Sequence, residues 1–308
     1  MRAILLQLSR NEWLKEHVPR WKFVRRAVRR FMPGETVDDA LDAAARYQQQ
    51  GIPAVITRLG ENVAGIEQAE QTRDHYLDAV DKIVERGLDA EISLKLTHLG
   101  LDLSEDAAYK YCEDIANKVL HKTGSDLFID MESGGYVQRT IDVYTRLKEI
   151  NDNVGLCIQS YLHRTDHDLG HLFSLHAPLR LVKGAYREPA SVAVTSKKKV
   201  DEMFFGQAQR MLQRTKHYGT RMIYATHDEN LIARIIDEAK KIELRREQVE
   251  FQMLYGVKTL LQKQLADEGY TVRMLISYGE SWYPWYMRRL AERPANLMFV
   301  LKNVVFRN

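Results

Sequence analysis

The chain has 308 residues, of which 45% are hydrophobic and 28% are charged, an ordinary composition for a globular protein. Its net charge of +3 is too small to predict nucleic-acid binding. No apolar run approaches the roughly 18 residues that a membrane-spanning helix requires, and the first apolar stretch is too short for a signal peptide, so we expect a cytoplasmic protein.

The first 50 residues predict a helical extension that precedes the main domain. Apolar residues recur there at helical spacing, interleaved with arginines: Trp13, Leu14, Val18, Trp21, Val24 and Val28. Residues 1–35 hold nine Lys and Arg against three Glu. A helix over residues 10–32 is therefore compatible with peripheral contact to an anionic membrane surface, although a helix packed across the main domain is the simpler interpretation.

A second helix is predicted after Pro33-Gly34. Thr36 is suited to cap its first turn, where Asp39 adds a carboxylate, and the Ala-rich stretch continues the helix to Gln50. Gly51 is well placed as the residue that ends this helix, because glycine readily adopts the left-handed conformation found there.

From residue 52 onward, short apolar runs alternate with charged segments that favour helices. The apolar runs are Pro53–Thr57, Ala90–Leu96, Leu127–Met131, Val154–Gln159, Leu179–Gly184, Thr220–Thr226, Val249–Met253 and Val272–Ser277. The helix-favouring segments include Glu67–Arg86, Ser104–Lys122, Tyr136–Ile150, Val200–His217 and Asn230–Lys241. This alternation predicts parallel strands covered on both faces. Eight runs favour a closed (βα)₈ barrel over residues 51–308, because the alternative, an open doubly wound sheet, lacks its G-x-G-x-x-G fingerprint after the first strand.

Polar residues gather on the expected strands and where those strands end, which is where barrel enzymes carry their active sites. They are Lys95, Asp130, Gln159, Arg180, Lys183, Thr226, His227, Glu250 and Gln252. Each alone has an ordinary explanation, such as a helix cap or a solvated charge. Together they favour a functional site, because unpaired charge inside a barrel is costly.

The last expected helix, in the segment SWYPWYMRRLAERPAN, carries the adjacent residues Arg288 and Arg289. Two guanidinium groups beside aromatic residues are suited to clamp a small carboxylate, since arginine offers a bidentate fork. The alternative is a solvated basic face, or one arginine paired with Glu292.

No metal site and no disulfide framework is predicted. Cys112 and Cys157 are the only cysteines, and Cys157 lies in an apolar run typical of a core thiol. His163 and His167 are four residues apart but lie in a polar segment, which argues against a zinc site.

Several segments, in this order and spacing, resemble the proline dehydrogenase family, specifically its short, single-function bacterial members. They are EISLKLTHLGLDLSED, DMES, IQSYLHRT, LRLVKGAYREP, ATHDE, EFQMLYGV and YMRRLAERPAN, and the resemblance covers about residues 50–300. It implies a distorted (βα)₈ barrel with a C-terminal lid helix and non-covalently bound FAD. It also implies oxidation of L-proline to 1-pyrroline-5-carboxylate, with electrons passed to a quinone-type acceptor.

The same resemblance implies roles for individual residues. The proline carboxylate would be held by Lys95, Arg288 and Arg289, with Asp130 supporting Lys95, and Arg180 would lie near the reactive edge of the flavin. FAD would be lined by Met131, Gln159, Lys183, Gly184, Ala185, Thr226 and His227. The substrate ring would be surrounded by Tyr186, Leu254, Leu275 and Tyr278. Glu61 would pair with Arg288 and close the site.

Two positions depart from the family pattern. Leu275 stands where short bacterial members usually carry a tyrosine that packs on the proline ring, so weaker proline affinity or altered tolerance for a hydroxylated ring are both open. Thr57-Arg58 stands where the family often has Asp-His. Alternative functions are a hydroxyproline dehydrogenase, a Schiff-base lyase that uses Lys95 or Lys183, and a ligand-binding sensor without turnover.

Overall fold

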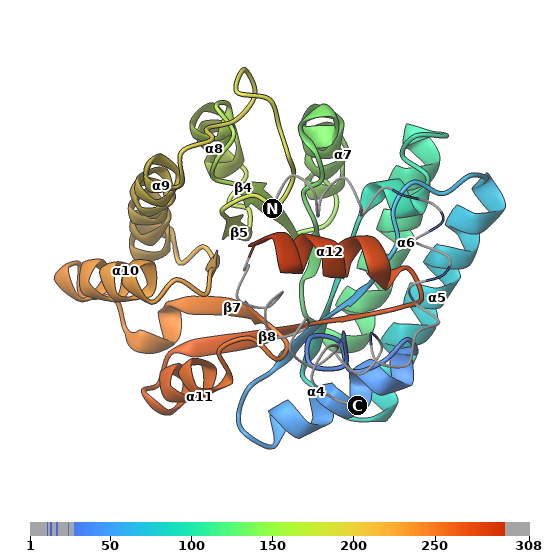
Figure 1. The fold of residues 1–308 in the computed structure, drawn as a ribbon, viewed down its shortest axis with the longest axis horizontal. Coiled ribbons are helices and arrows are strands. Elements are labelled where there is room, and N and C mark those ends of the chain that lie inside the picture. Colours follow the sequence, from blue (N-terminus) through green and yellow to red (C-terminus); the bar gives the residue numbers. More distant parts are fainter. Residues whose placement is uncertain (1–10, 12, 14–16, 18–23, 25–27, 293–308) are drawn as a thin grey trace.

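The computed structural model describes residues 28–292 and, before them, residues 11, 13, 17 and 24; in the last helix it describes side chains up to Met287. Eight strands form one closed parallel barrel in chain order, and helices lie around it (Figure 1). The predicted (βα)₈ barrel is therefore confirmed. Among the described residues, no helix has the length and apolar character needed to cross a membrane.

The strands lie within two residues of the predicted apolar runs. They are β1 (Ala54–Arg58), β2 (Ala90–Leu94), β3 (Leu127–Ile129), β4 (Val154–Gln159), β5 (Leu179–Val182), β6 (Met222–Ala225), β7 (Glu250–Leu254) and β8 (Thr271–Tyr278). Pairing of β8 with β1, in register from Ala54 opposite Met274 to Arg58 opposite Tyr278, closes the barrel. Closure leaves this sheet without an exposed edge.

The helices that cover the barrel are mostly those predicted. They are α4 (Val37–Gln48), α5 (Ile66–Glu85), α6 (Glu105–Thr123), α7 (Val137–Lys148), α8 (Thr165–Ser174), α9 (Lys197–Tyr218), α10 (Glu229–Lys241), α11 (Thr259–Asp267) and α12 (Trp282–Glu292). The short helices α8 and α11 were not among the predicted segments. Helix α12 crosses in front of the strands in Figure 1 and packs against Val28, Phe31 and Leu59.

Both ends of α4 have the predicted capping residues. Thr36 Oγ1 accepts a hydrogen bond from the Asp39 amide at 3.1 Å, and the Asp39 carboxylate accepts one from the Thr36 amide at 3.0 Å. At the other end, Gly51 has φ +73°, and the next amide, of Ile52, donates back to the Tyr47 carbonyl. The helix itself ends at Gln48, two residues before the predicted end, because the residues that follow form the turn that caps it.

The interior of the barrel is charged at the end opposite the loops that follow the strands. Arg221 donates to Glu91 at 2.6 Å, to Asp126 at 2.7 Å and, through two nitrogens, to Glu250 at 2.7 and 2.8 Å. Arg273 lies 3.4 Å from Glu91 and 3.5 Å from Glu250. We call these five residues the floor cluster. Its opposite charges compensate one another, so buried carboxylates are tolerated there.

Candidate active site

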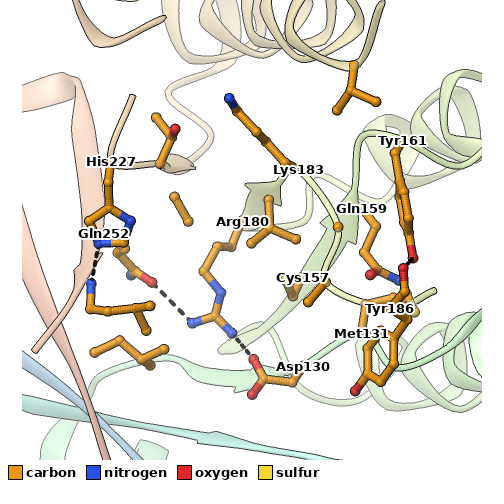
Figure 2. A pocket seen from close by; sticks show the side chains of 18 of the residues that line it. Asp130, Met131, Cys157, Gln159, Tyr161, Arg180, Lys183, Tyr186, His227 and Gln252 are labelled. Carbon is orange, nitrogen blue, oxygen red and sulfur yellow. Dashed lines mark hydrogen bonds and ion pairs between the residues drawn. The ribbon is translucent and has the colours of Figure 1, made fainter. Parts of the chain in front are cut away.

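A cavity of about 880 Å³ opens at the carboxyl ends of the strands (Figure 2). Every strand, or the residue that follows it, contributes to the wall, from Thr57 on β1 to Ser277 on β8. This is the end at which β/α-barrel enzymes carry out their chemistry. The volume is in the range of small-molecule and cofactor sites.

Most of the residues predicted for the site line this cavity. They are Lys95, Asp130, Met131, Gln159, Arg180, Lys183, Gly184, Ala185, Tyr186, Thr226, His227, Leu254 and Leu275. The structure brings them together because consecutive parallel strands of a closed barrel all end at the same rim.

Arg180 is the central cation of the cavity. It lies on β5, is 3% exposed, and donates to Ser93 Oγ at 2.8 Å, to Gln252 Oε1 at 3.1 Å and to Asp130. Figure 2 shows its guanidinium group between Gln252 and Asp130. Burial would lower the pKa of Arg180, but Asp130, Cys157 and Glu91 together outweigh burial and raise it. The guanidinium group is therefore a permanent positive charge in the cavity.

Asp130 connects the two cations nearest to it. Its Oδ2 lies 3.7 Å from Lys95 Nζ, while its Oδ1 accepts hydrogen bonds from Ser93 Oγ at 3.0 Å and from Arg180. Lys95 directly follows β2 and Asp130 directly follows β3, and these two strands pair in the barrel. The geometry thus allows Asp130 to orient both Lys95 and Arg180.

Lys183, on the loop after β5, contacts a second acidic site of the cavity, which consists of two aspartates. Its Nζ lies 2.5 Å from Asp201 Oδ1 and 2.9 Å from Asp228 Oδ2, and both aspartates line the cavity. The next residue, Gly184, has φ +119° and packs so closely on the Tyr161 ring that a Cβ has no room. Only glycine fits this position, and a ligand can approach the backbone closely beside it.

Neighbouring backbone groups hold His227 and Gln159 in place. His227 Nε2 accepts a hydrogen bond from the Leu254 amide at 2.9 Å, and Gln159 Nε2 donates to the Glu132 carbonyl at 2.8 Å. Each bond joins loops or strands that are separate in the sequence. Both cavity-lining side chains are therefore positioned by the protein itself.

Tyr278 does not take the predicted place beside the substrate. Leu275 and Ser277 of β8 face the cavity, so the alternation of side chains along the strand turns Tyr278 outward, toward α5. There its hydroxyl group lies 2.7 Å from His75 Nε2. Burial, together with the nearby Arg58, lowers the pKa of His75 to about 4, so the imidazole is neutral at pH 7. Tyr278 belongs to the packing between barrel and helix.

The predicted carboxylate clamp lies at the edge of what the structure describes. Arg288 and Arg289 are in α12, but their side chains are outside the described residues. Trp285 of the same helix lines the cavity. Glu61, the predicted partner of Arg288, follows β1, and its carboxylate accepts a hydrogen bond from the Tyr186 hydroxyl group at 3.5 Å. Helix α12 and the loop after β1 therefore both border the cavity region.

Sequence reasoning did not select several residues that line the cavity, among them Cys157, Tyr161, Asp201, Asp228 and Trp285. The sequence predicts a core thiol at Cys157, which is indeed 5% exposed but also forms part of the wall. Burial raises the pKa of this thiol. A signal was available, because Cys157 and Gln159 are two residues apart on one strand and so share a face.

A closed parallel barrel whose strands carry buried cations and carboxylates to one deep cavity defines an enzyme of the β/α-barrel class. The family model for proline dehydrogenase matches residues 40–302. Proline dehydrogenase 1 of Bacillus subtilis strain 168 is 37% identical over 305 residues, which are 99% of each chain. Proline dehydrogenase of Deinococcus radiodurans is 34% identical over 289 residues, 90% of this chain and 89% of that one. The chain belongs to the proline dehydrogenase family.

Solved structures show the same fold. Proline utilization A (PutA) from Bdellovibrio bacteriovorus, inactivated by N-propargylglycine, aligns with a TM-score of 0.82 at 22% identity. The alignment covers 99% of this chain but 37% of that larger protein. PutA from Bradyrhizobium japonicum aligns with a TM-score of 0.74 over 90% of this chain. At this identity the likeness concerns the barrel fold alone.

Proposed function

We propose that this chain oxidises L-proline to 1-pyrroline-5-carboxylate with FAD as its cofactor and a quinone-type electron acceptor. One observation carries the proposal. In a chain of this family, Lys95 and Arg180 meet around Asp130 inside a cavity of about 880 Å³. A small zwitterion offers few handles other than its carboxylate, and cations fixed around the cavity are suited to hold it in one orientation.

The residues of the cavity fit a flavin dinucleotide. FAD, when bound, would accept a hydride from the ring carbon next to nitrogen. The close backbone approach at Gly184, with Lys183, Ala185, Thr226 and His227 along the same wall, is suited to hold a large planar and phosphorylated group. Met131 and Gln159 would line the opposite wall. Arg180 would stabilise negative charge that develops in the reaction, because it is buried and permanently charged.

The substrate would lie between the flavin and α12. Lys95, Arg288 and Arg289 would hold its carboxylate, Asp130 would orient Lys95, and Tyr186, Leu254 and Leu275 would surround its ring. Glu61 would close the site by pairing with Arg288, and the bond from Tyr186 to Glu61 supports this role because it already connects the ring-binding wall to the loop after β1. Since the deprotonated amine is the better hydride donor, activity would rise with pH.

A hydroxyproline dehydrogenase is the second candidate, and Leu275 is the observation that favours it. This side chain lines the cavity and has neither a hydroxyl group nor a flat face to pack on the proline ring. The lyase alternative has less support. Lys183 forms ion pairs with two aspartates, and Lys95 lies 3.7 Å from Asp130, so each amine is engaged by a carboxylate and is not free to attack a carbonyl.

Anaerobic spectroscopy tests the proposal. The purified protein should be yellow and should bleach when L-proline is added without oxygen. A yellow protein that stays oxidised with proline but bleaches with hydroxyproline would favour the second candidate. A colourless protein that cannot be reconstituted with FAD would contradict both. The peripheral membrane contact of residues 10–32, which lie largely outside the described residues, is tested separately by co-sedimentation with anionic liposomes at low and high salt.

Replacing Lys95 by methionine tests the carboxylate clamp. K95M keeps the apolar stem but removes a cation, so kcat/KM for L-proline should fall by roughly 30-fold or more, the effect of losing about 2 kcal/mol. The spectrum of bound FAD should not change. The control is K110M, because Lys110 lies on the outside of α6 and pairs with Glu113. Equal activity of K95M and K110M would contradict the assigned role.

A further inference from the structure

We infer that Gln252 is a positioning residue that fixes the orientation of Arg180, and that Glu250 of the floor cluster holds the Gln252 amide in the required direction. The inference deepens the proposed function and rests on it. It concerns the face of Arg180 that is turned away from Asp130.

Gln252 lies in the middle of β7, is 3% exposed and is bound on both sides of its amide. Its Oε1 accepts a hydrogen bond from Arg180 Nη1 at 3.1 Å, and its Nε2 donates to Glu250 Oε1 at 3.1 Å. Glu250 and Gln252 are two residues apart on one strand, so their side chains leave the same face of the sheet. The amide therefore bridges the floor cluster and the cavity.

The chemistry of the two neighbours determines the direction of this amide. A guanidinium group can only donate hydrogen bonds, and an ionised carboxylate can only accept them. A flipped amide would place its NH₂ group against Arg180 and its carbonyl oxygen against Glu250. Both contacts would be repulsive inside the barrel, where such losses are most costly.

Glu250 stays ionised because Arg221 binds it through two nitrogens. Burial would raise the pKa of Glu250, but the contacts with Arg221, Arg273 and Gln252 together outweigh burial and lower it. Arg221 is held in turn by Glu91 and Asp126. Glu250, which accepts the hydrogen bond from the Gln252 amide, is thus part of a fixed cluster whose position does not depend on a ligand.

The other contacts of Arg180 complete its orientation. On the opposite side it donates to Ser93 Oγ and Asp130, and its guanidinium carbon lies 5.0 Å from the centre of the Phe128 ring. With Asp130 and Ser93 alone, the guanidinium group could still rotate about that pair of bonds. Gln252 removes this freedom, and as a neutral acceptor it does so without cancelling the charge of Arg180.

Two variants separate orientation from charge. Q252M keeps the size of the side chain and removes the acceptor, so kcat with L-proline should fall by roughly tenfold to a hundredfold while KM changes less than about twofold. Q252E keeps the acceptor but adds a negative charge beside Arg180, so the reduction potential of bound FAD should be lower than in wild type. The matched control is Q207M, because Gln207 is also buried but donates to the Ser160 carbonyl in the helical layer.

The holoproteins are compared in steady-state kinetics and in spectroelectrochemical titrations with a chemical reductant. A kcat loss confined to Q252M and a lowered potential in Q252E would support the inference. The inference would be overturned if Q252M had the same kcat as Q207M. It would also be overturned if the reduction potential of bound FAD in Q252E equalled that of wild type. If proline fails to reduce the wild-type flavin, the proposed function fails, whereas the potentials, which need no proline, still decide the role of Gln252.

Discussion

Glu132 is a buried carboxyl group just behind the cavity wall. It is 3% exposed, and its oxygens accept hydrogen bonds from the Thr97 amide at 3.2 Å and from the Thr97 hydroxyl group at 2.6 Å. Burial raises its pKa from 4.5 to about 7, although the Thr97 contacts and Lys95 act in the opposite direction, and Glu61 adds to the rise. Between about pH 4.5 and 7, the folded state therefore keeps a proton on Glu132, whereas the unfolded chain has released it.

The raised pKa of Glu132 predicts a loss of stability as pH rises. Below pH 4.5 the neutral Glu132 carboxyl group makes its full contribution to the free energy of unfolding. This contribution, on the order of 3 kcal/mol in total, is lost between about pH 4.5 and 7. E132Q keeps the size and an acceptor for Thr97 but does not titrate. Its free energy of unfolding should therefore vary less over this range and match or exceed that of wild type at pH 8. Urea unfolding at pH 5, 6 and 8 measures this, with E85Q on the surface of α5 as control.

A glycine on one strand of the barrel gives space to an aromatic ring on the neighbouring strand. Gly155 of β4 lies beside the Phe128 ring of β3, and a Cβ at this glycine would lie 2.5 Å from a ring carbon. The ring in turn packs against two guanidinium groups, of Arg180 at 5.0 Å and Arg221 at 5.4 Å. Phe128 therefore separates the cavity cation from the floor cluster, and β4 leaves it the necessary space.

Replacing Gly155 by alanine should destabilise the barrel. The methyl group must push the Phe128 ring aside, which should lower the free energy of unfolding by roughly 1–3 kcal/mol and weaken FAD binding through Arg180. G206A in α9 is the matched control, because a Cβ there meets nothing within 4 Å. In a helix interior this change should stabilise by roughly 0.5–1 kcal/mol. Thermal unfolding of both variants measures these changes in stability. A G155A protein as stable as wild type would contradict the packing argument.

On the scale of the whole molecule, the floor cluster connects strands that are far apart in the chain. Glu91 lies on β2, Glu250 on β7 and Arg273 on β8, while Arg221 and Asp126 directly precede β6 and β3. Their contacts form only when the barrel closes. The cluster should therefore contribute to the cooperativity of unfolding as well as to its free energy.

Removing the shared cation should reveal this contribution. R221M removes the cation shared by Glu91, Asp126 and Glu250 and leaves only Arg273 near Glu91 and Glu250. The free energy of unfolding at pH 7 should therefore fall by roughly 3–5 kcal/mol. The loss should be smaller at pH 4, since unpaired buried carboxylates take up protons as the pH falls. Urea unfolding at both pH values tests this against R210M, which removes an exposed pair with Asp166 and should cost less than about 1 kcal/mol. Equal losses in the two variants would refute the assignment.

The candidate site was predictable where a residue lies at the end of a strand. Lys95, Asp130 and Thr226 lie at or near the ends of predicted apolar runs and directly follow β2, β3 and β6, so the barrel pattern alone brings them to one rim. Tyr278 shows where such reasoning stops. Its neighbours allow either face of β8 to point inward, and the register with β1 turns Leu275 toward the cavity and Tyr278 toward α5.

The sequence by itself determined the eight strands and most of the helices, with strand ends correct to within two residues. Thr36, Asp39 and Gly51 act on backbone groups a few residues away, and each apolar run indicates a buried strand. Local chemistry is therefore sufficient to predict these elements. Only the tertiary structure decided the partners of the buried charges. Arg180 meets Gln252, and Arg221 meets Glu91, across the barrel interior. Such contacts depend on closure and register, which arise from all eight strands together and from no single segment.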